Sequence, residues 1–101
     1  MNILKLLDVI EWSIEDAKSY NDGLAAVRGF TIYRDVILYL VAEGKVELTD
    51  DRSKFDEYIK MFTISALYKV AEHYRKTNNM PQLLYTQPIY YAKEQRHADY
   101  H

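Results

Sequence analysis

Hydrophobic residues at the start of the chain recur at every third or fourth position, with polar residues between them. This is the spacing of one face of an α-helix, so the pattern predicts an amphipathic helix over residues 2–20. Gly23, which follows Asn21 and Asp22, ends this helix because glycine adopts a positive φ without a steric penalty. The predicted buried stripe is Ile3, Leu6, Leu7, Ile10, Ile14 and Ala17, and Leu4, Val9 and Trp12 widen it.

Residues 24–43 are apolar on nearly all sides. Because a helix of this kind is usually buried by neighbours on two sides, we expect it to be the most buried helix of the protein. The β-branched residues within 36–41 leave a strand as an alternative, but the lack of turn residues from Leu24 to Glu43 favours a helix. Gly29 lies inside this helix and indicates either close packing or a weak point, and Gly44 ends it.

A third helical pattern covers residues 53–77, with Thr49 or Ser53 as its cap and acidic residues near its first turn. Residues 61–65 are richer in Phe, Thr and Ile than a helix prefers, so a break near Thr63 is left open. The predicted fold is all-α, with a small three-helix bundle over residues 1–79. The stripe of the third helix is Phe55, Ile59, Phe62, Ala66, Val70 and His73.

Residues 80–101 form a C-terminal extension without a sustained hydrophobic period. Aromatic residues make up 14% of the chain, and ten of them are tyrosines, which is more than three helices of this length can bury. Tyrosine and tryptophan are enriched at protein interfaces, where they give large contact areas at small entropic cost. Three alternatives stay open: the aromatic-rich extension packs across the bundle and completes its core, docks on a second copy, or docks on another protein.

Composition and charge exclude several classes of protein. The 101 residues include no cysteine, which excludes disulfides, thiolate metal sites and a cysteine nucleophile. Residues 36–42 form the longest apolar run, about a third of the length of a membrane span. The first ten residues do not resemble a signal peptide. We therefore expect one domain that has no membrane contact and lies in the cytoplasm.

Histidine positions give little support for catalysis. His97 and His101 are spaced to lie on one helix face, with Asp99 between them, and two such histidines can share a transition metal. They end the chain without a fixed third ligand, so we expect a solvated tail rather than a metal site. His73 falls on an apolar stripe without a serine elbow or a cysteine, so we expect a histidine at the edge of the core rather than a general base.

The acidic residues of the first helix also have a simpler interpretation. Glu11, Glu15 and Asp16 place carboxylates on one side of that helix, where paired carboxylates can hold a hard cation or act as acid and base. A solvated acidic face is the expected outcome. The three glycines are isolated and form no phosphate-binding loop. We therefore expect that the protein is not an enzyme and has no cofactor, metal ion or small-molecule substrate.

A protein-binding module is the leading functional hypothesis: a small regulator, inhibitor or neutralising partner that self-associates. Its charge is uneven, with −3 over residues 1–22, −3 over residues 46–57 and +3 over residues 58–101, which would steer a charged protein or a second copy. The expected contact residues are Trp12, Leu84, Tyr85, Ile89, Tyr90 and Tyr91. An acidic patch of Glu47, Asp50, Asp51, Asp56 and Glu57 would suit a basic partner.

Nucleic-acid binding by the basic C-terminal half is the alternative. A helix-turn-helix would present the first turn near residues 50–57 to DNA, and phosphates would repel its carboxylates. The formal net charge of −2 also disfavours a dedicated nucleic-acid binder, so this partner is not expected. The face available for it comprises Lys69, Arg75, Lys76, Lys93 and Arg96, with Tyr74, Tyr90 and Tyr91 for stacking.

Overall fold

The computed structural model describes residues 1–20 and 23–81. This part of the chain is all-α, as predicted, and its helices are α1 (Ile3–Lys18), α2 (Leu24–Ala42), α3 (Arg52–Ile59) and α4 (Ile64–Thr77). The first two match the predicted ranges closely, whereas the single helix expected over residues 53–77 is two helices. The turn at Asn21-Asp22 and nearly all of the predicted extension over residues 80–101 lie outside the described residues.

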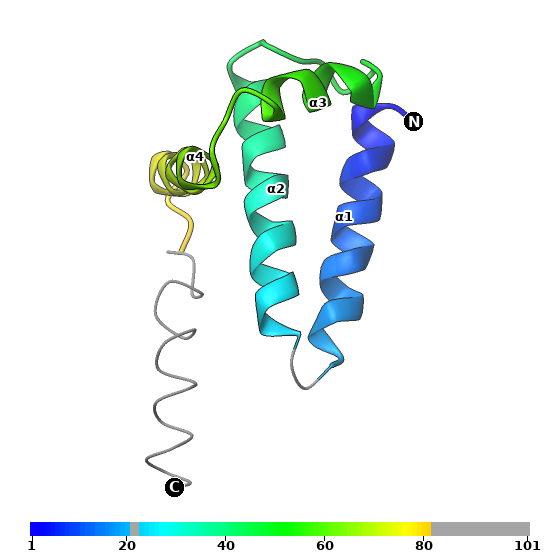
Figure 1. Ribbon diagram of the computed structural model, residues 1–101, viewed down its shortest axis with the longest axis vertical. Helices are drawn as coiled ribbons and strands as arrows, with labels where there is room; N and C mark the ends of the chain where they lie inside the picture. Colours follow the sequence, from blue (N-terminus) through cyan, green and yellow to red (C-terminus); the bar gives the residue numbers. More distant parts are fainter. Residues whose placement is uncertain (21–22, 82–101) are drawn as a thin grey trace, which may run out of the picture.

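The four helices are arranged around α2. Helices α1 and α2 run antiparallel as a hairpin, and α3 lies across the end of the hairpin that carries the N-terminus (Figure 1). Helix α4 runs across α2 on the side away from α1. The prediction that this apolar helix has neighbours on two sides is therefore confirmed.

The core lies between α1 and α2 and is closed at one end by Phe55 of α3. The stripe predicted for α1 is confirmed, with its members buried and Leu7 partly so. The buried residues of α2 all lie between Asp35 and Leu40, and they are fewer than those of the shorter α1, so the expectation that α2 is the most buried helix is wrong. The physical reason is that α4 crosses α2 there, leaving Leu24 at the other end 41% exposed.

Backbone hydrogen bonds join the start of α1 to the loop before α3. The N–H groups of Ile3 and Leu4, which have no acceptor inside a first helical turn, donate to the carbonyls of Asp50 and Leu48 at 2.8 and 3.0 Å. The Asn2 side chain caps α1 by accepting from the backbone of Lys5 at 2.9 Å. This arrangement holds the N-terminal end of α1 beside α3 without a strand in the described part of the chain.

The break that the sequence left open lies at residues 60–63. Thr63 has an extended backbone, and its hydroxyl oxygen accepts a hydrogen bond from the N–H of Ala66 at 3.0 Å, which caps α4. Because of the break, the buried face of α4 does not continue the hydrophobic stripe of α3. The buried residue of α4 is Ala71. His73, predicted on the stripe, is exposed, with only the edge of its ring against Tyr39.

Candidate protein-docking face on the hairpin of α1 and α2

The outer face of α1 carries apolar side chains that the sequence analysis placed at the margin of the buried stripe. Trp12 is 70% exposed and Val9 is 40% exposed, so the expectation that they widen the stripe is wrong. The reason is geometric: Ile10 and Ile14 already fill the side of α1 that faces the core. Trp12 is thus a large aromatic side chain that α1 exposes to solvent.

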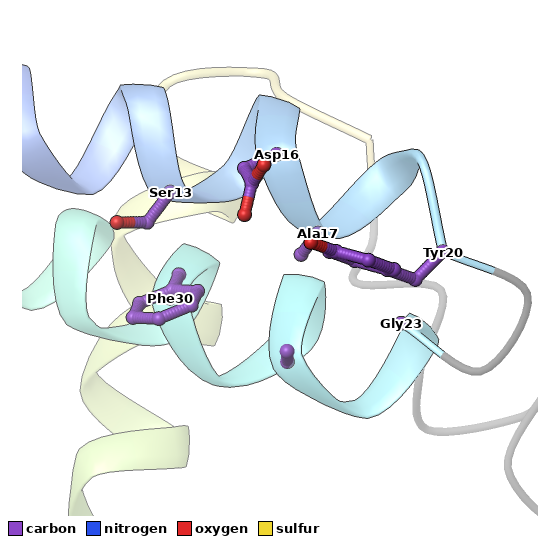
Figure 2. Close-up of a pocket in the computed structure, with 7 residues that line it drawn as sticks. Ser13, Asp16, Ala17, Tyr20, Gly23 and Phe30 are labelled. Atoms are coloured by element: carbon purple, nitrogen blue, oxygen red, sulfur yellow. The ribbon is translucent and has the colours of Figure 1, made fainter.

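A groove begins beside this face, near the turn of the hairpin. One hollow of about 320 Å³ lies between α1 and α2 (Figure 2). The exposed ring of Tyr20 forms its end, and Ala17 and Phe30 give it apolar walls. The carboxylate of Asp16 supplies a charge at this end. The lining residues are Ser13, Asp16, Ala17, Tyr20, Gly23, Ala26 and Phe30.

A second hollow of about 180 Å³ continues from the first toward α3. Ser13 and Phe30 line both hollows and therefore join them into one feature, the α1–α2 groove. The second hollow is mostly apolar, and its charged group is Arg52 at the start of α3. Its lining residues are Leu6, Val9, Ile10, Ser13, Phe30, Tyr33, Arg52 and Phe55.

Two residues of the groove, Ser13 and Tyr33, make contacts that stabilise the fold. Ser13 donates to the backbone carbonyl of Val9 at 2.8 Å, within its own helix, rather than to a base. Tyr33 lies edge-on to Phe55, with ring centroids 5.9 Å apart, and thereby contributes an aromatic wall. The chemistry of the groove is apolar and aromatic along its length, with an acid at one end and a base at the other.

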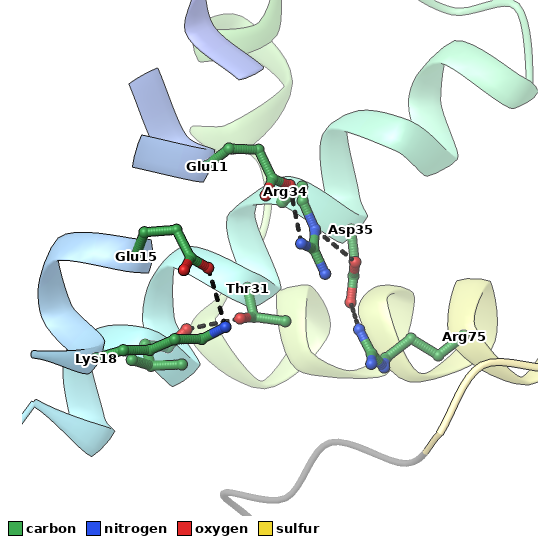
Figure 3. Close-up of polar contacts among 8 residues, drawn as sticks. Glu11, Glu15, Lys18, Thr31, Arg34, Asp35 and Arg75 are labelled. Carbon is green, nitrogen blue, oxygen red and sulfur yellow. Dashed lines mark hydrogen bonds and ion pairs between the residues drawn. The ribbon is translucent and has the colours of Figure 1, made fainter. Parts of the chain in front are cut away.

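A chain of charged groups fixes the helices that carry this face (Figure 3). Arg34 on α2 donates to Glu11 on α1 at 2.9 Å, and its Nε lies 3.5 Å from Oδ1 of Asp35. Arg75 on α4 donates to the other Asp35 oxygen at 2.8 Å. Desolvation lowers the pKa of Arg34, but the bond to Glu11 and the charges of both acids outweigh it and raise that pKa. The network thus connects α1, α2 and α4 through a fully buried carboxylate.

This network changes the interpretation of the predicted basic face. Arg75 was expected to be available to nucleic acid, but its side chain is only 12% exposed and also donates to the carbonyl of Pro81 at 2.7 Å. Lys69 and Lys76 are exposed on α4, and Tyr74 is half-buried. Lys93 and Arg96 lie outside the described residues. Nucleic-acid binding by the remaining groups stays a prediction.

Two acids of the predicted acidic patch have local structural partners. Asp51 caps α3 by accepting from Ser53 N at 3.0 Å, in place of the expected caps Thr49 or Ser53, and it lies 3.7 Å from the N-terminal amine. This backbone bond lowers the pKa of Asp51. Asp50 accepts from the N–H of Glu47 and lies 3.2 Å from Lys54, and both contacts lower its pKa.

The other members of the patch are less constrained. Asp56 lies 3.4 Å from Arg52, while Glu47 and Glu57 are exposed. Binding of a basic partner to this patch stays a prediction. The predicted contact residues Leu84, Tyr85, Ile89, Tyr90 and Tyr91 lie outside the described residues, as do His97, Asp99 and His101.

Two carboxylates of α1 form ion pairs with neighbouring basic side chains. Glu11 pairs with Arg34, and Glu15 lies 3.0 Å from Lys18. Asp16 has no ion pair in residues 1–20 and 23–81. Within those ranges, no three acidic or histidine side chains lie close enough together to hold a metal ion. The helices of the described part are also too short or too polar to cross a membrane.

The hydrophobic pattern of the sequence does not place Tyr20, Tyr33 and Asp16 on one surface. Tyr20 and Tyr33 belong to different helices, and only the folded hairpin places them on one groove. The structural role of Asp35 could have been predicted from the sequence, because an acid inside an apolar segment needs a polar partner when it is buried. Comparisons with protein-family models, curated proteins and solved structures found no match for this chain.

Proposed function

We propose that the protein is a non-enzymatic protein-binding module, a small regulator or inhibitor, and that it binds through the α1–α2 groove and the adjoining outer face of α1. The observation that carries the proposal is Trp12, which is 70% exposed on α1, three residues from Val9 in the lining of the groove. Tryptophan and tyrosine anchor protein interfaces because they bury large areas at small entropic cost. A cytoplasmic location belongs to the same proposal, and the absence of cysteine fits the reducing compartment that this implies.

The surroundings of Trp12 support a protein partner over a small molecule. The aromatic groups Tyr20 and Tyr33 are 61% and 42% exposed, and Val9 adds an aliphatic contact. They are spread along two helices rather than gathered in an enclosed cavity, which is the geometry of an interface. Asp16 and Arg52 at opposite ends of the groove supply charges that set the orientation of a bound partner.

A photo-crosslinking amino acid placed at position 12 tests the proposal. A benzophenone side chain there should give a discrete adduct with a protein, either this chain or another, in cells that make the protein. The same side chain at Lys69, exposed on α4 away from the hairpin groove, is the matched control. The proposal is wrong if position 12 gives no protein adduct beyond that obtained at position 69.

A further inference from the structure

The outer face of α1 carries a short, ordered stripe of four residues. Lys5, Val9, Trp12 and Asp16 are spaced by four, three and four positions, which places them in one row along the helix. This is the spacing of a helix–helix contact seam. Lys5 and Asp16 are exposed, and Val9 and Trp12 are 40% and 70% exposed. The row is therefore accessible within the described structure.

The row is complementary to itself when it is reversed. Its order is base, apolar, apolar, acid, so an antiparallel copy places each Lys5 opposite the other copy's Asp16. The same register places each Trp12 opposite the other copy's Val9. Along α1, the midpoint between Lys5 and Asp16 lies between residues 10 and 11, and so does the midpoint between Val9 and Trp12. One two-fold axis therefore satisfies both kinds of contact.

The charges of this face are free to make such contacts. Neither Lys5 nor Asp16 makes an ion pair in the part of the chain that the structure describes, whereas Glu11 and Glu15 are paired with Arg34 and Lys18. Asp16 lies eleven positions after Lys5 on the helix, so the two intermolecular ion pairs would lie about 16 Å apart, one on each side of the tryptophans.

We infer that the occupant of this face is a second copy of the chain, packed with α1 antiparallel to α1 of the first copy. This inference rests on the proposed protein-binding function and names the partner. Lys5 and Asp16 set the direction and register, and Trp12 and Val9 form the apolar centre. The two-fold axis also brings the grooves of the two copies to the same side of the pair, because Val9 and Asp16 line them.

Charge reversal and charge exchange test the inference on the full chain. Asp16→Lys places like charges opposite each other at both ends of the seam, and so does Lys5→Asp. Each reversal turns two attractive contacts into two repulsive ones, so each should weaken dimerisation by about tenfold or more. The double variant Lys5→Asp/Asp16→Lys restores opposite charges and should dimerise within about threefold of the original chain. Light scattering across a concentration series measures the dissociation constants.

Glu57→Lys is the matched control, since it makes the same charge change on an exposed face of α3. It should leave the dissociation constant of the dimer unchanged. The double variant keeps the net charge of the original chain, and circular dichroism of every variant checks that each one is folded. The inference is overturned if the chain is a monomer throughout the series, if neither single reversal weakens the dimer, or if the double variant does not restore it.

The intrinsic fluorescence of Trp12 gives a second readout, because the chain has a single tryptophan. Its emission should move to longer wavelength on dilution, as the ring returns to water, and the Asp16→Lys variant should show this shift at higher concentration. Crosslinking at position 12 separates the two proposals. An adduct with a different protein, together with a monomeric chain, overturns the second-copy inference and leaves the binding function standing. Absence of any protein adduct overturns both.

Discussion

At the scale of single residues, the stability of the fold depends on Asp35, a buried carboxylate that needs a charged partner. It lies at 0% exposure in the buried half of α2, where an unpaired carboxylate would be costly. Arg75 donates to its Oδ2 at 2.8 Å, while Arg34 reaches Oδ1 only at 3.5 Å. Oδ1 has no hydrogen-bond donor in the described structure, so Arg75 carries the compensation almost alone.

Arg75→Leu should therefore lower the free energy of unfolding by about 3 kcal/mol, because it leaves a buried charge without its main partner. Urea denaturation followed by circular dichroism measures this. Lys76→Leu, at an exposed position on the same helix, should change stability by less than about 0.5 kcal/mol. Asp35→Leu/Arg75→Leu should recover most of the loss, since it removes both charges. Equal effects of the two single variants would show that Arg75 is not holding Asp35.

At the scale of helices, α1 and α2 could be predicted because each has an uninterrupted pattern with a glycine at its end. The division between α3 and α4 could not be fixed, because the apolar residues on either side of the break still fit one helical row. Thr63 decides the outcome by capping α4 with its hydroxyl, a local bond that hydrophobic spacing does not reveal. The same phase error placed His73 on a buried stripe.

The proposed docking face was predictable only in part. Trp12 was predicted as a contact residue, yet the groove beside it also draws residues from a second helix and depends on how the hairpin packs. The basic face was expected to include Arg75, because sequence spacing does not show that Asp35 lies across from it on another helix. Long-range pairs between helices are the kind of information that one amphipathic pattern does not contain.

Replacing two glycines in or beside α2 by alanine should change the free energy of unfolding in opposite directions. A Cβ on Gly29 would meet no atom within 4 Å, which favours the weak-point interpretation over close packing. Gly29→Ala should raise the free energy of unfolding by about 0.5–1 kcal/mol. Gly44 has a φ of 73° just after the helix, so Gly44→Ala should lower it by about 1 kcal/mol. Thermal unfolding of both variants measures the two changes in stability. If both variants were stabilised, or both destabilised, the roles given to Gly29 and Gly44 would be contradicted.

At the scale of the whole molecule, the described residues form a continuous core that links all four helices. The buried hydrophobic residues run from Ile3 to Ala71, and α4 is attached to α2 through Asp35 and Arg75. Pro81 accepts the hydrogen bond from Arg75 Nε, so the last contact of this network also falls within the described range. These contacts favour a folded unit that ends at residue 81, with the proposed dimer seam at its opposite side on α1.

A chain that ends at Pro81 should therefore keep its helical signal and its unfolding midpoint, because no contact of the described core is removed. It should also dimerise as the full chain does and respond in the same way to Asp16→Lys. Circular dichroism and light scattering of the two lengths, at matched concentrations, make the comparison. An unfolded short chain would show that the aromatic extension completes the core. A folded but monomeric short chain would place the interface in the extension, and the α1 seam would then be wrong.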